Sequence, residues 1–227
     1  MIGAHPGGIR LTRRLLKMAG ITAPDRQSLE GIQVSCAGTA GKALDLGAGM
    51  GESVCYLRML GYDAVGIDRD AGTDGRGSAL DKAAPISVIQ GDMTALPFQD
   101  ESFDLCLAEC SIAVCGDGPG ALQEAYRVLC PGGSLLLSDV FFHKEHAPVL
   151  SMPGPLTFSC WEQETARAGF VLRKSSDETD LWREFFLESL WNDNADEAFC
   201  SFFQEAGKAG CGYFLAWLWK GETNGFI

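Results

Sequence analysis

The chain has 227 residues, 46% hydrophobic and 21% charged, a composition typical of one globular domain with a sizeable core. Its 30 acidic and 18 basic residues give a formal net charge of −12, which disfavours a nucleic-acid substrate because phosphate backbones repel acidic proteins. No apolar run approaches the roughly 18 residues that span a bilayer. The nine cysteines are scattered and contain no CxxC pair, so we expect reduced thiols and a cytoplasmic protein.

Residues 9–19 have the spacing of a short amphipathic helix. One face holds Ile9, Leu15, Leu16 and Ala19, and the more exposed positions hold Arg10, Arg13, Arg14 and Lys17. We interpret this helix as a lid or buttress over a ligand site, with a solvated basic face as the alternative. Residues 22–42 are polar and weakly periodic, which predicts a loop or insertion.

From residue 43 onward, short apolar runs alternate with helical stretches. Strands are predicted near residues 43–46, 62–68, 86–92, 103–110 and 134–142, and helices near 51–60 and 119–130. The residues expected to pack the first of these helices on the sheet are Val54, Leu57, Met59 and Leu60. This alternation predicts a parallel sheet covered on both faces, with the ligand beyond the carboxyl ends of its strands.

The last third of the chain differs from this core, because all five tryptophans lie beyond residue 160. Two sets of apolar residues have helical spacing: Trp182, Phe185, Phe186 and Leu190, and then Phe199, Phe202, Phe203 and Ala206. These helices either cover the sheet or form an aromatic wall for an acceptor pocket or a dimer contact. Residues 211–219 are predicted to form the final strand, paired as a hairpin with a strand near 170–175.

The stretch KALDLGAGMGES, residues 42–53, joins a strand to a helix through a glycine loop. Its third glycine, Gly51, comes one residue too early for the GxGxxG pattern of dinucleotide-binding proteins. The loop is also preceded by Asp45, inside an otherwise apolar strand. A carboxylate at that point suits a positively charged amino group better than a pyrophosphate.

Two further strands end in an acid. Asp68 is well placed to accept hydrogen bonds from both hydroxyls of a ribose, and Asp92 can accept one from an adenine amine, with Met93 against the ring. The predicted ligand therefore has an ammonium group, a ribose and an adenine but no phosphate. S-adenosylmethionine meets this description, and its sulfonium also favours an acidic cavity.

Four segments carry a family resemblance: LDLGAGMG, the acid of VGID, QGDMTALPFQDESFDLCLAEC and YRVLCPGGSLLLSDVF. In order and spacing they resemble the motifs of class I S-adenosylmethionine-dependent methyltransferases, in the small-molecule branch of quinone C-methyltransferases and arsenite methyltransferases. The resemblance covers roughly residues 40–145 and implies an α/β, Rossmann-like, doubly wound sheet. This sheet would have seven strands, mostly parallel, with an antiparallel last strand.

The same resemblance implies a single methyltransferase domain over residues 1–227. Residues 1–42 would form the lid helix and loop, 43–145 the cofactor-binding core, and 146–227 an aromatic-rich part that completes the sheet and acceptor pocket. The resemblance implies a small-molecule methyl acceptor as the partner. From charge and composition we expect no nucleic acid and no membrane, and the chain would be a monomer or a homodimer.

Site residues are also implied by the resemblance. The loop of Gly47, Ala48 and Gly49 would hold the methionine end of the cofactor together with Asp45; Ala48 stands where many relatives carry Cys. Asp68, with Arg69 beside it, would take the ribose hydroxyls, and Asp92 and Met93 the adenine. Glu109 and Cys110 would form the floor of the methyl-transfer centre. Independently of the resemblance, a helix at 9–19 placed over the cofactor would bring Arg10, Thr12 or Arg13 to the methionine carboxylate, unless its basic face is simply solvated.

The acceptor itself is not indicated by the sequence. Candidate general bases at the carboxyl edge of the sheet are Glu109, Asp139, His143 and His146. Cysteines 106, 110 and 115 leave open a thiol-bound metalloid acceptor, although free cysteines usually serve as small buried hydrophobes. Two other hypotheses of function remain. One is an NAD-dependent oxidoreductase, which the loop spacing and Asp45 disfavour, and the other is a non-catalytic cofactor-binding partner subunit. No metal site is predicted.

Overall fold

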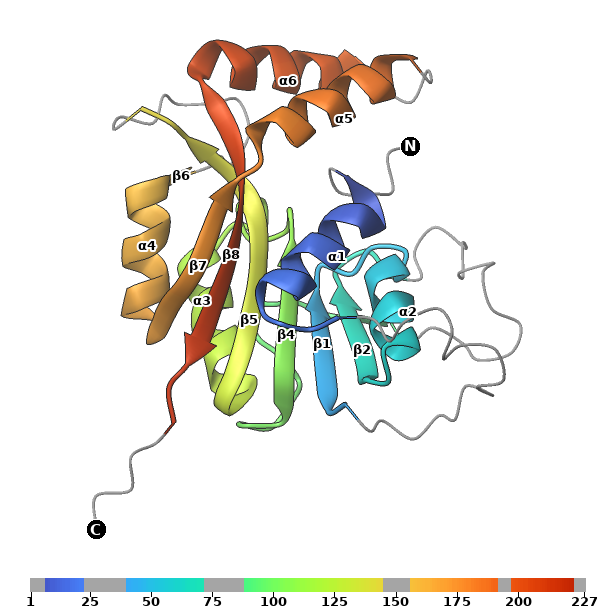
Figure 1. Ribbon diagram of the computed structural model, residues 1–227, viewed down its shortest axis with the longest axis vertical. Coiled ribbons are helices and arrows are strands. Elements are labelled where there is room, and N and C mark those ends of the chain that lie inside the picture. Colours follow the sequence, from blue (N-terminus) through green and yellow to red (C-terminus); the bar gives the residue numbers. More distant parts are fainter. Residues whose placement is uncertain (1–6, 23–39, 72–87, 145–155, 192–196, 223–227) are drawn as a thin grey trace.

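The computed structural model describes residues 7–22, 40–71, 88–144, 156–191 and 197–222 (Figure 1). Most of the predicted loop at 22–42, together with His146 among the candidate bases, lies outside the described residues. So do the side chains of Phe186, Leu190 and several aromatic positions after residue 195.

Eight strands form one mixed sheet in the order β3-β2-β1-β4-β5-β8-β7, with β6 paired to β5. Strands β1 to β5 run parallel, and β8 runs antiparallel to both β5 and β7. This topology confirms the mostly parallel sheet with an antiparallel last strand, and the two-residue β6 is an addition to it. The strands are β1 Lys42–Leu46, β2 Asp63–Asp68, β3 Val88–Gln90, β4 Phe103–Glu109, β5 Leu129–Phe142, β6 Leu156–Thr157, β7 Phe170–Asp177 and β8 Cys211–Lys220.

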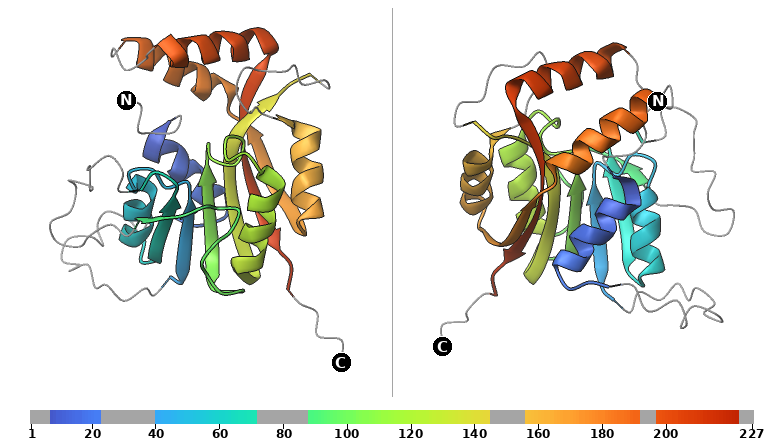
Figure 2. Two further views of the ribbon diagram at one scale, coloured as in Figure 1. Left: turned by 180° about the vertical axis from the view of Figure 1, so that it is seen from behind. Right: turned by 45° about the horizontal axis from the view of Figure 1, so that its top comes forward.

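Helices cover both faces of this sheet and one of its edges. Helices α1 and α2 lie on one face, α3 and α4 lie on the other, and α5 and α6 lie across the carboxyl edge (Figures 1 and 2). The helices are α1 Gly8–Met18, α2 Glu52–Met59, α3 Gly118–Val128, α4 Phe158–Arg167, α5 Thr179–Trp191 and α6 Glu197–Ala209. Within the described ranges, no helix is long and apolar enough to cross a bilayer.

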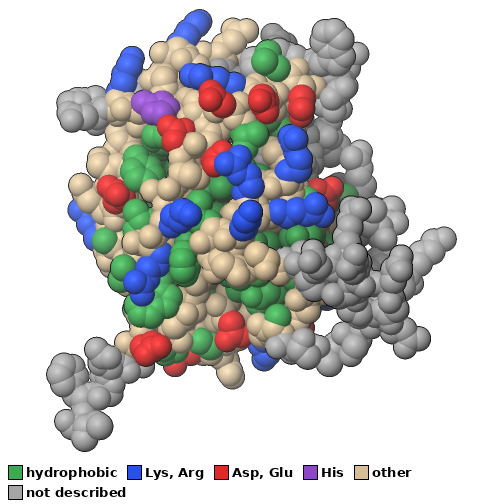
Figure 3. Space-filling model, in the orientation of Figure 1, with side chains coloured by type: hydrophobic (Ala, Val, Ile, Leu, Met, Phe, Trp, Pro, Cys, Tyr) green, Lys and Arg blue, Asp and Glu red, His purple; other side chains and the backbone are tan. Residues whose placement is uncertain are grey.

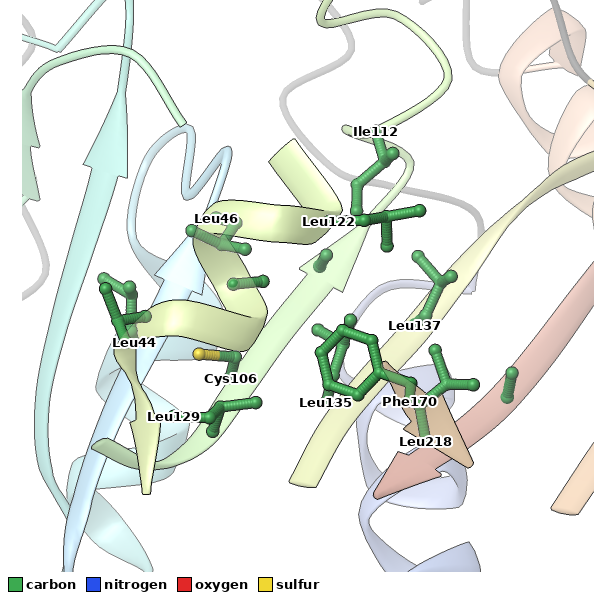
Figure 4. Packing of buried hydrophobic residues seen from close by; sticks show 14 of the residues in the cluster. Leu44, Leu46, Cys106, Ile112, Leu122, Leu129, Leu135, Leu137, Phe170 and Leu218 are labelled. Carbon is green, nitrogen blue, oxygen red and sulfur yellow. The ribbon is translucent and has the colours of Figure 1, made fainter. Parts of the chain in front are cut away.

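Two apolar cores result, one on each face, because successive side chains of a strand point to opposite faces. In β4, Cys106 and Ala108 join the core under α3 and α4, which Figure 4 shows with Cys106 among leucines. Leu105 and Leu107 join the core under α1 and α2 instead. Each fully buried leucine stabilises the fold by roughly 1.5–3 kcal/mol. Glu109 follows the same alternation and points toward α1.

Three details differ from the sequence-based expectations. Met59, expected to pack on the sheet, is 68% exposed, because the side of α2 that faces the sheet is formed by Val54 and Leu57. Strand β5 begins at Leu129 rather than at residue 134, with a register shift in its pairing to β4. Strands β7 and β8 are antiparallel neighbours as expected, but α5 and α6 separate them in the chain, so they do not form a simple hairpin.

Helix α1 has the amphipathic character that its sequence predicts. Its buried side chains include Leu11, Leu15 and Leu16, and its four basic residues, Arg10, Arg13, Arg14 and Lys17, are all exposed. Figure 3 shows Lys and Arg side chains gathered over this side of the molecule. Arg14 pairs with the buried carboxylate of Glu178 at 2.7 Å, so the basic face also fastens α1 to the segment that leads into α5.

Candidate active site

A cavity of about 210 Å³ opens at the carboxyl edge of the sheet. It lies between the ends of β1, β2 and β3 and the loop that follows β4, where open α/β sheets bind their ligands. Six of the predicted site residues line it: Gly47, Asp68, Arg69, Asp92, Met93 and Cys110. The tertiary structure thus brings residues from three of the four sequence motifs to one cavity.

The glycine loop is tied to the end of β2. The backbone N–H groups of Gly47 and Ala48 both donate to the carbonyl of Ile67, at 2.9 and 3.1 Å, and the N–H of Gly49 donates to Asp68 at 2.9 Å. Gly47 and Gly49 have φ of 78° and 50°, a left-handed conformation that favours glycine. The Ala48 side chain packs toward Gly66 in β2, so Ala48 can present only its backbone to a ligand at the cavity.

The two acids that line the cavity are held in place by neighbouring groups. The second oxygen of Asp68 accepts from the N–H of Asp70 at 2.9 Å. One oxygen of Asp92 accepts from both the N–H and the hydroxyl of Thr94, and these hydrogen bonds lower the pKa of Asp92. Arg69 donates to the carbonyl of Cys115 at 3.2 Å, across the cavity from β2.

Two more predicted acids, Asp45 and Glu109, are buried behind the glycine loop and do not line the cavity. Burial raises the pKa of Glu109 to about 7, even though the hydroxyls of Thr12 and Ser53 donate to its carboxylate at 3.1 and 3.0 Å. Burial also raises the pKa of Asp45, which the charges of Glu109 and Asp68 raise further. These acids therefore repel one another in a site without a cation.

Cys110 lines the cavity in a strained conformation. Its φ of 53° is left-handed, which is uncommon for any residue but glycine and is often found at functional sites. Its thiol donates to the hydroxyl of Tyr213 at 3.2 Å, and that hydroxyl donates to Ser138 at 2.9 Å. Burial raises the pKa of Cys110, so it is a neutral thiol at pH 7.

The other two cysteines near the predicted transfer centre differ in position. Cys115 lines the same cavity as Cys110, whereas Cys106 is fully buried in the core under α3 and α4 (Figure 4). Cys106 therefore cannot reach a ligand in the cavity. Over the described ranges, no group of three or more His, Cys, Asp or Glu side chains is arranged to hold a metal ion.

His143, the predicted histidine base, borders a different cavity of about 460 Å³ between α1 and α5. Its ring nitrogen lies 3.3 Å from the hydroxyl of Thr179 and 3.9 Å from a carboxylate oxygen of Asp177. Asp139, another candidate base, is buried, and its carboxylate accepts the N–H of Ala113 at 2.9 Å. Asp139 therefore holds the loop after β4 in place.

Sequence reasoning did not single out Ser53, Ser111 or Tyr213. Ser111 was the easiest to find, because residues that follow the carboxyl end of a parallel strand line the ligand crevice. Tyr213 had no such signal, since its contact with Cys110 depends on β8 lying beside β5. Ser53 is likewise recognisable only once Glu109 is known to point toward α2.

The fold is that of a doubly wound α/β protein, with a cavity at the carboxyl edge of its sheet, where such proteins bind their ligands. Residues 44–137 match a family described as a methyltransferase domain. The chain is 35% identical over 120 residues to a malonyl-[acyl-carrier protein] O-methyltransferase of Erwinia billingiae, covering 51% of this chain and 47% of that protein. It is 33% identical over 175 residues to an arsenite methyltransferase of Aquipseudomonas alcaligenes, covering 67% of this chain and 47% of that protein.

The chain thus spans about half the length of each of these two relatives. Among solved structures, a phosphoethanolamine N-methyltransferase of Haemonchus contortus in complex with S-adenosylmethionine has the same fold. The TM-score is 0.71 at 17% identity, covering 96% of this chain and 54% of that one. These similarities support a class I S-adenosylmethionine-dependent methyltransferase with S-adenosylmethionine as its cofactor.

Proposed function

We propose that this chain transfers the methyl group of S-adenosylmethionine to a small molecule. The observation that carries the proposal is the single cavity lined by Asp68, Asp92 and Met93 together with Gly47 of the glycine loop. Carboxylates at the ends of β2 and β3 match the hydroxyls of a ribose and the amine of an adenine. A bound sulfonium and ammonium would favour the charged forms of the buried acids Asp45 and Glu109, whose pKa values burial raises.

Methyl transfer from a sulfonium is an in-line displacement. The bond from the methyl carbon to sulfur breaks while a bond to the acceptor forms, and sulfur keeps the electron pair, which leaves S-adenosylhomocysteine. Because the leaving group is good, the protein mainly has to align the two reactants and exclude water. A general base is needed only where the acceptor must also lose a proton.

The proposed roles of the residues follow from this chemistry. Cys110 lies at the cavity and would contact the reacting groups, whereas Glu109 is buried behind the loop and would act through its charge. His143 would act as a base only on an acceptor that reaches from the cofactor cavity into the cavity between α1 and α5. We place the acceptor under α5 and α6, which lie across the carboxyl edge of the sheet (Figure 2).

The two relatives are named for different acceptors, malonyl-[acyl-carrier protein] and arsenite. For this chain we propose an organic acceptor, because the raised pKa of Cys110 keeps its sulfur protonated and Cys106 is out of reach of the cavity. In a metalloid–thiolate complex each thiol has lost its proton, and burial also raises the pKa of Cys115, the other cysteine at the cavity. The described cysteines are all free, which supports a protein that works in the reducing cytoplasm.

Calorimetric titration tests the cofactor assignment. S-adenosylmethionine and S-adenosylhomocysteine should bind with micromolar affinity, and Asp68→Ala should weaken both by about 10- to 100-fold, because hydrogen bonds to an ionised acid are lost. Asp68→Asn, which keeps an oxygen for the N–H of Gly49, should lose less affinity for both ligands than Asp68→Ala. Binding of NADH without any response to S-adenosylhomocysteine would instead favour an oxidoreductase.

Turnover needs its own test. Purified protein is incubated with labelled S-adenosylmethionine and a panel of small-molecule acceptors, and formation of S-adenosylhomocysteine is followed. Transfer to a small molecule that is lost in Asp68→Ala supports the proposal. Tight cofactor binding with no transfer to any member of a broad panel would favour a non-catalytic partner subunit.

A further inference from the structure

The hydroxyl of Ser111 stands out among the polar groups of the protein. Ser111 is 6% exposed, and its oxygen has no hydrogen-bond partner among the residues that the structure describes. Among the described residues, it is the only buried side-chain nitrogen or oxygen atom without a hydrogen-bond partner. An unpaired buried polar group costs about 1–3 kcal/mol, so such groups in native proteins call for an explanation.

The backbone around Ser111 is held firmly on both sides. Before it, the N–H of Cys110 donates to the carbonyl of Ser138 at 2.8 Å, and the Cys110 backbone adopts the left-handed conformation. After it, the N–H groups of Ile112 and Ala113 donate to the buried carboxylate of Asp139. These hydrogen bonds fix the backbone on both sides of Ser111, while its hydroxyl is left without a partner among the described residues.

This firmly held serine lies at the cofactor cavity. Ser111 is part of the cavity lining, next to Cys110 and across from Asp68 and Asp92. It also comes so close to the glycine loop that a Cβ added to Gly47 would lie 2.5 Å from the Cβ of Ser111. Ser111 therefore packs directly against the glycine loop, and only a glycine fits beside it at position 47.

We propose that Ser111 is a binding residue for the cofactor and donates a hydrogen bond to an oxygen or nitrogen of bound S-adenosylmethionine. This inference rests on the proposed function, because the cavity must hold that cofactor. The hydroxyl exchanges its unpaired state for a hydrogen bond when the cofactor enters. Ser111 therefore lowers the stability of the free protein and raises its affinity for the cofactor.

Two measurements on Ser111→Ala test the proposal. Binding of S-adenosylhomocysteine, measured by calorimetry, should weaken about tenfold, which corresponds to the loss of one hydrogen bond. The unfolding midpoint of the free protein in urea should stay the same or rise, because an unpaired buried hydroxyl has been removed. A serine that only supports the fold would give the opposite pair of results, lower stability and unchanged affinity.

Ser134→Ala is the matched control. Ser134 lies in the same sheet, and its hydroxyl accepts from the indole of Trp217 at 2.9 Å, so it already has a partner away from the cavity. This variant should lose some stability and keep the wild-type affinity. Titration with adenosine then locates the partner atom: a weaker response in Ser111→Ala assigns it to the adenosine half, and an unchanged response assigns it to the methionine half.

Unchanged affinity of Ser111→Ala for both S-adenosylhomocysteine and adenosine, with normal binding by the wild type, would overturn the role of Ser111 and leave the proposed function standing. Failure of the wild type itself to bind S-adenosylhomocysteine would overturn the proposed function instead. The two failures are therefore distinguishable in one set of titrations.

Discussion

The hydroxyl of Thr12 in helix α1 lies 3.1 Å from a carboxylate oxygen of Glu109 at the end of strand β4, and both residues are buried. The two are 97 positions apart in the sequence. Ser53 donates to the same carboxylate from the first turn of α2, at 3.0 Å. Helix α1 thus contributes directly to the environment of an acid that stands behind the proposed cofactor cavity, and we expect its docking to be coupled to the ionisation of Glu109.

Replacing Thr12 by valine should reveal this coupling. Valine keeps the shape of threonine but cannot donate, so the buried carboxylate of Glu109 loses one of its hydrogen bonds. We expect the free energy of unfolding at pH 8 to fall by about 1–2 kcal/mol, and the affinity for S-adenosylhomocysteine to fall as well. Urea denaturation and calorimetry measure the two effects. Thr12→Ser, which keeps the hydroxyl, is the control and should remain close to wild type in both.

Neutralising Glu109 should change how stability depends on pH. The pKa of Glu109 is about 7 in the folded protein and 4.5 ordinarily, so folding favours its protonated form. Its contribution to stability is fully present below pH 4.5 and is lost as the pH rises through 7. The loss amounts to about 3 kcal/mol. Glu109→Gln should lack this decrease.

Urea denaturation at several pH values between 5 and 8 checks this expectation. The difference between wild type and Glu109→Gln matters, because Asp139, whose pKa is also about 7, contributes a similar decrease to both proteins. Removing the charge of Glu109 also removes part of the repulsion that raises the pKa of Asp45. Glu109→Gln should therefore be the more stable protein at pH 8. If the difference in free energy of unfolding between wild type and Glu109→Gln is the same at pH 5 and pH 8, the assigned pKa is contradicted.

The two glycines of the loop offer a matched pair of substitutions. Gly47→Ala would place a Cβ 2.5 Å from that of Ser111 at a φ of 78°, which combines a steric clash with an unfavourable backbone. We expect it to cost roughly 2–4 kcal/mol of stability and to abolish cofactor binding. Gly49→Ala meets nothing within 4 Å and carries only the backbone cost at a φ of 50°, roughly 1–2 kcal/mol. Equal effects of the two substitutions, measured by urea denaturation and calorimetry, would show that the clash with Ser111 relaxes freely.

The state of the Cys110 sulfur can be tested with arsenite. Because burial raises its pKa, Cys110 should remain a thiol at pH 7.5, and arsenite should not raise the melting temperature of the protein. Cys110→Ser is the comparison, and both proteins should respond alike in thermal unfolding. A rise in the wild type that disappears in Cys110→Ser would instead support a thiol-bound metalloid acceptor.

The sequence determined the sheet and half of the residues that line the proposed cofactor cavity. Apolar runs such as the one around Leu44 appear directly in the sequence, and strands that run parallel must bring their carboxyl ends to one edge. For that reason the acids Asp68 and Asp92, each the last or nearly the last residue of its strand region, could be assigned to one site before the structure was known. Met59 was assigned wrongly because helical spacing alone does not say where a short helix turns away from the sheet.

Only the tertiary structure decided which side chains complete the site from other layers. Whether Thr12 meets Glu109, or Tyr213 meets Cys110, depends on how α1 docks and on which strand lies beside β5, contacts between parts of the chain that no local pattern records. That the hydroxyl of Ser111 is unpaired could not be predicted from the sequence either, because the lack of a partner is a property of the packed loop. Local periodicity is set by neighbouring residues, whereas burial and hydrogen bonding are set by segments that meet only when the chain is folded.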